Sequence, residues 1–191
     1  MAYTPTNAAP WVPGAPVAML VFYRAHLQSG NTAVFDAMQA ALAQAGLNTL
    51  AVAVDSLKNP ESLAALQAMA AQQGVGVVLN ATSFAASTSS EPRTASILER
   101  ADCPILQLAF AGVEQGEWQD AARGLGPRDL AMNVVLPEVD GRIFTRAVAF
   151  KAAERFDALT QCGIIVPRVA PDRVAFVADL AAHWARLRRT P

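Results

Sequence analysis

The feature of this sequence that most constrains its fold is the alternation of short apolar runs with segments of helical periodicity. The apolar runs are Val17–Tyr23, Thr49–Val54, Val75–Asn80 and Ile105–Ala109. Each run is continuous and short, a pattern typical of strands that are covered on both faces of a parallel sheet. Three successive β-α-β crossovers with right-handed connections are then expected. The sequence therefore predicts a doubly wound α/β fold with a mainly parallel sheet.

The segments between these runs have apolar residues at helical spacing and glycines where the helices are expected to end. The positions are Val34, Met38, Ala41, Leu42 and Ala45 before Gly46, and Leu63, Leu66, Met69 and Ala70 before Gly74. A third helix is predicted over residues 93–101, and His26–Gly30 is expected to form a loop. This order of elements predicts a flavodoxin-like arrangement.

The last third of the chain has a different pattern. Asn133–Leu136 has the composition of a strand, which Pro137 is expected to end. Arg142–Lys151 alternates like a half-buried strand, and Cys162–Val166 is expected to pair with it in a small antiparallel extension. Asp172–Arg188 has its apolar residues on one face and predicts a C-terminal amphipathic helix.

These patterns divide the chain into three parts. Residues 1–16 contain four of the twelve prolines and no apolar periodicity, so an extended or disordered leader is expected. Residues 17–125 form the predicted parallel α/β domain. Residues 126–191 form the strand-rich extension and the C-terminal helix, which are expected to pack on the same core.

Composition and charge exclude several functional classes. Fifteen basic and sixteen acidic residues leave a net charge near −1. The chain therefore lacks the positive electrostatic field that would attract nucleic acid or anionic lipid. No apolar run approaches the length of about 20 residues that spans a membrane. The N-terminus lacks the basic and apolar segments of a signal peptide, which indicates a cytoplasmic protein. Cys103 and Cys162 are interpreted as small reduced core residues.

Polar residues follow the predicted strands at their carboxyl ends, where doubly wound sheets bind ligands. Tyr23, Arg24 and His26 follow the first strand, and Ser56 and Lys58 follow the second. His26 can reach a ligand carboxylate or a metal ion, and the alternative is a surface or capping histidine. The other side chains have a similar alternative, because loops are polar simply through contact with water.

The chain has no phosphate-binding loop. Gly74-Val75-Gly76 precedes a strand, whereas the glycines of a phosphate-binding loop precede a helix. This chain is therefore not expected to bind ATP.

The segment Leu136–Arg142 carries the most specific chemistry in the sequence. Glu138 and Asp140 are two residues apart, so an extended backbone would project both carboxylates to one side. Gly141 permits a turn with positive φ. Two such acids can hold a hard cation or accept protons from a bound group. The alternative is a common Pro-x-x-Asp-Gly turn with solvated acids.

Several segments, in this order along the chain, resemble one protein family. They are Phe22–Thr32, Ser56–Lys58, Arg123–Leu125, Asp129–Met132, Leu136–Arg146 and Trp184–Arg189. The family is the large subunit of aerobic cobaltochelatase, called CobN, which is itself similar to the porphyrin-binding H subunit of magnesium chelatase. The likeness extends from about residue 17 to residue 191. Family members are several times longer, so the chain resembles an internal fragment of one.

The resemblance implies a role in cobalamin biosynthesis. Cobalt(II) would be a substrate, inserted into the corrin precursor hydrogenobyrinic acid a,c-diamide by a ligase that forms metal–nitrogen bonds. ATP would be bound by two separate ATPase-type subunits, which fits the missing phosphate loop. The other partners implied are the remaining domains of the large subunit and a corrin or porphyrin substrate. The isolated fragment is expected to be inactive.

The resemblance also ranks the candidate residues. It implies that Glu138 and Asp140 act as catalytic carboxylates, with Gly141 and Arg142 beside them at the substrate. Substrate-binding candidates at the strand ends are Tyr23, Arg24, His26, Ser56 and Lys58. Arg24 and Lys58 can pair with acetate or propionate groups of a corrin, or form structural salt bridges. A second hypothesis for the chain is a non-catalytic flavodoxin-like module for ligand binding or subunit assembly.

Overall fold

The computed structural model describes residues 1–85, 102–120, 124–159 and 161–188. The helix predicted over residues 93–101 lies outside these ranges. The strands are β1 (Ala2–Tyr3), β2 (Val17–Tyr23), β3 (Asn48–Val54), β4 (Val75–Asn80), β5 (Ile105–Ala111), β6 (Ile143–Asp157) and β7 (Cys162–Val169). The helices are α1 (Arg24–Gln28), α2 (Ala33–Gln44), α3 (Pro60–Gln73), α4 (Gln115–Asp120), α5 (Pro127–Leu130), the π-helix η2 (Ala131–Val135), α6 (Leu136–Val139) and α7 (Pro171–Leu187).

The described strands form one sheet with the order β1-β3-β2-β4-β5-β6-β7. Strands β2 to β6 run parallel to their neighbours, whereas β1 pairs antiparallel with β3 and β7 pairs antiparallel with β6. The predicted mainly parallel α/β sheet, its antiparallel extension and the C-terminal helix are confirmed. The central order β3-β2-β4-β5-β6 is that of flavodoxin-like folds.

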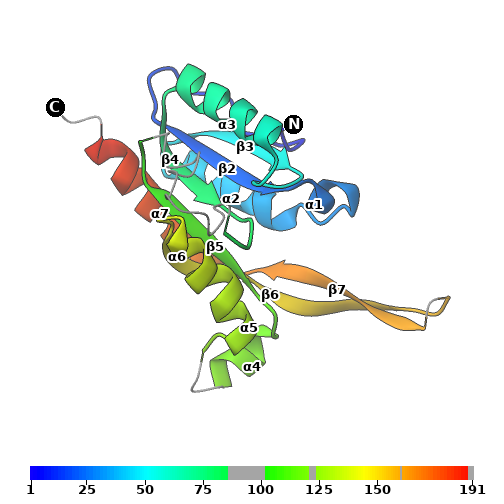
Figure 1. The fold of residues 1–191 in the computed structure, drawn as a ribbon. Coiled ribbons are helices and arrows are strands. Elements are labelled where there is room, and N and C mark those ends of the chain that lie inside the picture. Colours follow the sequence, from blue (N-terminus) through cyan, green and yellow to red (C-terminus); the bar gives the residue numbers. More distant parts are fainter. Residues whose placement is uncertain (86–101, 121–123, 160, 189–191) are drawn as a thin grey trace.

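Strand β2 shows why the central strands are mostly apolar. Its residues alternate between two hydrophobic clusters, with Leu20 and Phe22 in one and Met19 and Val21 in the other. Figure 1 shows the helices that cover these faces, with α3 on one side of the sheet and α2 and α7 on the other. A polar residue at any of these positions would be buried without water, which is costly.

Helix ends follow local sequence chemistry. The Asn59 side chain accepts hydrogen bonds from the backbone N–H groups of Glu61 (2.9 Å) and Ser62 (3.4 Å), and so caps the N-terminus of α3. Gly74 ends the same helix in the left-handed conformation, at φ 60°. This places β4 directly after α3, as the sequence predicted.

Some elements differ from the sequence-based predictions. The expected loop after β2 instead begins with the short helix α1, and Gly30 follows it at φ 73°. At the N-terminus, β1 joins the sheet edge, and the Asn48 side chain bonds to both the N–H and the C=O of Val12. Cys162 is exposed, so its assignment to the core was wrong, and Cys103 is half-buried.

The predicted strand at Asn133–Leu136 is wrong. These residues lie within a run of helical turns formed by α5, η2 and α6. Pro137 lies in the first turn of α6, where a missing N–H is best tolerated, directly after the wider π turn. Among the described helices, none combines the length and apolar character that a membrane span requires.

Candidate functional site

The switch point of the sheet lies between β2 and β4, since the chain leaves β2 for β3 on one side and enters β4 on the other. Doubly wound sheets bind ligands at the strand carboxyl ends at this point. A cavity of about 460 Å³ lies there. Its walls include Tyr23, His26, Ser83, Phe110, Asp129, Met132 and Asn133. The sequence therefore predicted the location of two wall residues, Tyr23 and His26.

The polar side chains of this cavity are held by short contacts. The Tyr23 hydroxyl donates to the Ser83 carbonyl at 2.9 Å, which joins the ends of β2 and β4. The His26 ring meets the rings of Phe35 and Phe110 edge-on, with centroids 5.0 and 5.8 Å away. Burial raises the pKa of Tyr23 and lowers the pKa of His26. Both side chains are therefore neutral near pH 7.

The opposite wall of the cavity combines the end of β5 with the helical turns of α5 and η2. The Gly112 N–H donates to Asp129 Oδ2 at 2.8 Å, and the Asn133 side chain donates to the Asp129 carbonyl at 3.1 Å. A Cβ at position 112 would lie 3.1 Å from Asp129 Oδ1, which favours glycine there. Gly112 directly follows β5, whereas Asp129 and Asn133 come from α5 and η2, where the signal in the sequence was the family resemblance at Asp129–Met132.

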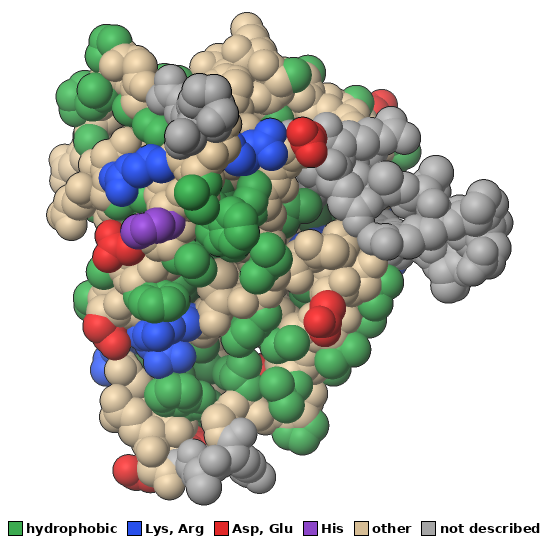
Figure 2. Space-filling model, turned by 90° about the vertical axis from the view of Figure 1, so that its left-hand side faces the viewer, with side chains coloured by type: hydrophobic (Ala, Val, Ile, Leu, Met, Phe, Trp, Pro, Cys, Tyr) green, Lys and Arg blue, Asp and Glu red, His purple; other side chains and the backbone are tan. Residues whose placement is uncertain are grey.

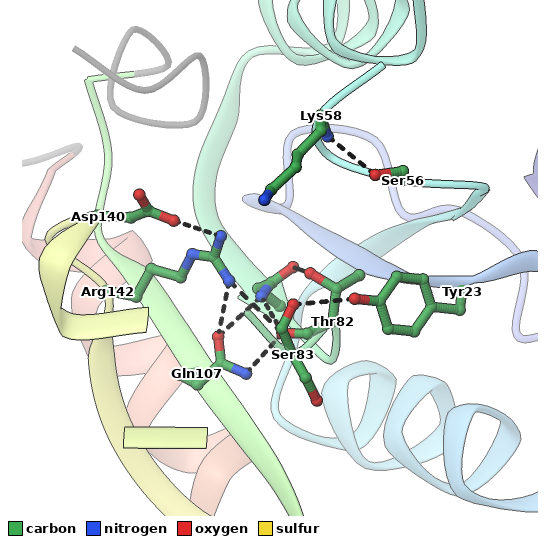
Figure 3. Close-up of polar contacts among 9 residues, drawn as sticks. Tyr23, Ser56, Lys58, Thr82, Ser83, Gln107, Asp140 and Arg142 are labelled. Carbon is green, nitrogen blue, oxygen red and sulfur yellow. Dashed lines mark hydrogen bonds and ion pairs between the residues drawn. The ribbon is translucent and has the colours of Figure 1, made fainter. Parts of the chain in front are cut away.

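A polar network is buried beside the cavity, at the ends of β4 and β5 (Figure 3). The Asn80 side-chain amide donates to Gln107 Oε1 at 2.7 Å and to the Thr82 carbonyl at 3.0 Å. The Gln107 amide donates to the same carbonyl at 2.9 Å. These three residues have no exposed surface. Such networks stabilise a fold only when their members are bonded, as here.

Arg142 and Asp140 extend this buried polar network, and among the described residues Arg142 Nε has no hydrogen-bond partner. Arg142 Nη2 lies 2.6 Å from Asp140 Oδ2, and Nη1 is 3.4 Å from the Thr82 carbonyl and from Gln107 Oε1. Side-chain exposure is 0% for Arg142 and 1% for Asp140. Desolvation lowers the pKa of Arg142, and the charge of Asp140 opposes that shift. Arg142 therefore connects the turn between α6 and β6 to Thr82 and Gln107, and Asp140, from the same turn, neutralises its charge.

The two acids of the Leu-Pro-Glu-Val-Asp-Gly segment do not face the same side. The prediction assumed an extended backbone, but Glu138 lies in α6 and Asp140 is its C-cap. Glu138 is exposed, whereas Asp140 is buried. Gly141 has φ 72°, as the predicted turn requires. The segment therefore combines one surface carboxylate with one internal ion pair.

Glu138 lies among exposed apolar side chains. Val135 and Val139 are 55% and 54% exposed; Val135 shares the helical face of Glu138 at i−3, and Val139 is the next residue along the exposed side of α6. Leu130 and Ile143 are also exposed, at 43% and 46%. Figure 2, a view from the side of α6 and α7, shows hydrophobic side chains gathered on this side of the molecule. We call the surface formed by Leu130, Val135, Glu138, Val139 and Ile143 the α6 face.

The remaining candidates lie at the ends of β2 and β3. Arg24 pairs with Asp55 at 2.7 Å, with both side chains about half exposed. The Ser56 hydroxyl accepts from the Lys58 backbone N–H at 3.1 Å, which closes a local turn. Figure 3 shows the Lys58 side chain extending toward the side of the sheet that carries the buried polar network. None of these residues lines the switch-point cavity.

The described ranges contain no cluster of three or more His, Cys, Asp or Glu residues that is arranged to hold a metal ion. Fold and site together define a doubly wound α/β module in which one surface helix presents a carboxylate among apolar side chains. A family model described as CobN/Magnesium Chelatase matches residues 2–191. The chain belongs to this family, and the resemblance noted from the sequence is confirmed.

Individual relatives agree with this assignment. The chain is 45% identical over 174 residues to the aerobic cobaltochelatase subunit CobN of Sinorhizobium sp, covering 91% of the chain and 14% of the relative. The chain is 39% identical over 183 residues to the CobN subunit of Pseudomonas aeruginosa, and the match covers 96% of the chain and 14% of that subunit. The chain is 28% identical over 191 residues to the chloroplastic magnesium-chelatase subunit ChlH of Oryza sativa subsp. indica, and the match covers 93% of the chain and 13% of that subunit.

A solved structure shows the same fold. It is the catalytic subunit of cobaltochelatase from Mycobacterium tuberculosis, with a TM-score of 0.76 and 30% sequence identity over 98% of this chain and 16% of that chain. The chain thus spans about a seventh of the length of these relatives. It corresponds to a fragment of a cobaltochelatase large subunit.

Proposed function

We propose that this chain forms one wall of the tetrapyrrole-binding cavity in an ATP-dependent cobaltochelatase. The observation that carries the proposal is the α6 face, where an exposed carboxylate is surrounded by exposed apolar side chains. Exposed apolar patches mark binding surfaces, and the flat faces of a tetrapyrrole macrocycle are largely apolar. The substrate in the complete cytoplasmic enzyme is hydrogenobyrinic acid a,c-diamide, in the aerobic route to cobalamin.

Glu138 is the proposed catalytic carboxylate. When Co²⁺ enters the macrocycle, two pyrrolic protons leave and the ion loses bound water. A carboxylate at the edge of the ring can accept one of these protons or hold the hydrated ion before insertion. Asp140 cannot do this from its buried position, and we propose that it and Arg142 orient the α6 face. We propose that ATP is used by partner subunits of the ATPase type, which is compatible with the lack of a phosphate-binding loop in this chain.

The test is the substitution Glu138→Gln in a complete large subunit, assembled with its ATPase partners. The subunit would carry this chain in place of the matching stretch of the Sinorhizobium relative, which is 45% identical to it. The rate of cobalt insertion is expected to fall by about 10²–10⁴-fold, the usual contribution of a proton-transfer group. Glu117→Gln, an exposed acid on α4, is the matched control. An unchanged rate for Glu138→Gln would exclude the catalytic role.

The switch-point cavity supports a second candidate function, a non-catalytic ligand-binding or assembly module. Its walls place the neutral side chains of Tyr23 and His26 opposite the charged residues Arg128 and Asp129, which suits a ligand with both polar and charged groups. Fluorescence titration of the isolated chain with a corrin precursor separates the two. Binding that Glu138→Gln weakens and Tyr23→Phe leaves unchanged supports the α6 face, and the reverse result supports the cavity.

A further inference from the structure

The hairpin of β6 and β7 extends beyond the body of the protein (Figure 1). Strand β6 pairs with β5 only as far as Phe150. From Lys151 to Asp157 its partner is β7, with Lys151 opposite Pro167 and Asp157 opposite Cys162. We call this two-stranded part the ribbon. A ribbon of two strands is marginally stable in water unless another surface covers it.

The two halves of the ribbon differ in how their edges are protected. Near the body, Lys151 and Pro167 face one another across the hairpin, with Arg168 beside them. Lysine and proline are residues that protect exposed strand edges from pairing with other chains. The outer half has no such residue in β7, where residues 162–166 read Cys-Gly-Ile-Ile-Val without a charge. The edge formed by residues 162–166 of β7 is therefore unprotected by charge, whereas the opposite strand carries Glu154, Arg155 and Asp157 in its sequence.

Large apolar side chains are exposed on the same outer half. Phe156 is 64% exposed, Leu159 is 93% exposed and Ile165 is 51% exposed. An uncharged edge such as residues 162–166, with exposed aromatic and aliphatic side chains beside it, is an aggregation hazard unless it is covered. The same composition is typical of permanent interfaces, whereas transient interfaces are more polar.

We propose that the outer half of the ribbon is covered by another domain of the same large subunit. The relatives are about seven times longer than the matched stretch, so most of such a subunit is available to cover it. The apolar composition favours this permanent neighbour over ATPase partners that bind and dissociate. The inference rests on the family assignment and not on the catalytic role of Glu138.

The first test uses the isolated chain. The double substitution Phe156→Ser with Leu159→Ser is expected to shift the melting temperature by less than about 2 °C, because nothing in the described chain covers these side chains. The control is Phe150→Ser at the base of β6, where the ring is 1% exposed and packs on Trp118. Its melting temperature is expected to fall by more than about 10 °C. A comparable fall for the double variant would overturn the proposal.

The second test compares hydrogen exchange in the isolated chain and in the full-length Pseudomonas aeruginosa subunit, which is 39% identical. Amides that align with residues 156–166 are expected to have protection factors at least about tenfold higher in the full-length subunit. Amides that align with β2 serve as the control and are expected to be protected in both. Equal protection of the ribbon in the two proteins would overturn the proposal, as would concentration-dependent protection in the isolated chain, which would indicate a second copy.

Discussion

Glu138 and Asp140 are two residues apart, yet they belong to regions with opposite physical character. Asp140 is part of the buried polar network, where its carboxylate contacts the Arg142 guanidinium at 2.6 Å. Glu138 is exposed on the α6 face between Val135 and Val139. The difference arises because α6 ends at Asp140, and the turn directs that side chain inward. One short segment thus combines a structural anchor with a surface that is available to a substrate.

The largest expected effect is in the buried polar network. Arg142→Met would leave Asp140 buried without this ionic partner, so the free energy of unfolding is expected to fall by about 3–5 kcal/mol. Urea denaturation measures the change. The double variant Arg142→Met with Asp140→Leu removes both charges, and its free energy of unfolding is expected to fall much less than that of Arg142→Met. A single variant that loses under about 1 kcal/mol would show that the pair does not anchor the turn.

A smaller loss is expected where the network meets the switch-point cavity. Tyr23→Phe removes the hydroxyl that donates to the Ser83 carbonyl at 2.9 Å. The free energy of unfolding is expected to fall by about 1 kcal/mol, the usual net contribution of one hydrogen bond. Tyr3→Phe, which removes a 2.7 Å bond to Asp36 at the far edge of the sheet, is a comparison of similar chemistry. If Tyr23→Phe alone lowers the free energy of unfolding by more than about 3 kcal/mol, the hydrogen bonds of the cavity and of the buried polar network are energetically coupled.

The pH dependence of stability tests the character of the cavity. Burial lowers the pKa of His26 in the folded state, so the unfolded state binds more protons as the pH falls through the ordinary histidine pKa near 6.5. The stabilising contribution of neutral His26 is present above that pH and is lost on acidification, by less than about 1.4 kcal/mol per pH unit. Thermal unfolding at pH 7 and pH 5 should show a larger loss for the wild type than for His26→Gln. Equal losses of stability in the two proteins would indicate that the His26 side chain is exposed to solvent.

The smallest effect on stability is expected on the α6 face. Glu138→Gln should change the free energy of unfolding by no more than about 0.5 kcal/mol, since the side chain is exposed. The same denaturation experiment on Glu117→Gln gives the baseline for a surface acid. Substantial unfolding of Glu138→Gln would remove the contrast between the two regions, because any loss of chelation would then reflect folding.

Much of the sheet could be predicted from the sequence, because a strand buried on both faces must be apolar at every position. Strands β2 to β5 satisfy that requirement at most positions, and the buried amides of Asn80 and Gln107 are exceptions that are hydrogen-bonded to one another. These strands were located within a residue or two at most ends. The C-terminal helix was predicted from a face that includes Val174 and Val177, both now in the core. These signals are local and strong. They need no knowledge of the rest of the chain.

The region from Pro127 to Val139 could not be predicted in the same way. Val134 and Val135 favour strands, and Pro137 is usually a strand or helix terminator. The helix forms despite this because its turns pack against β5 and the start of β6, a tertiary contact that no local pattern contains. The same limitation applies to Asp140 and Arg142, whose burial depends on Thr82 and Gln107 from distant strands.

The π turn η2 has a consequence for how this surface can evolve. A π turn holds one residue more than an α turn, so deleting one residue within Ala131–Val135 would restore regular α-helical register. Everything that follows in the helix would then rotate by about 100°, the angle between successive residues. Glu138 would leave the α6 face, and a different side chain would take its place. The presence of one residue in this segment therefore decides which side chain lies on the α6 face. Among related proteins, the number of residues in the segment is expected to vary less than the identity of those residues.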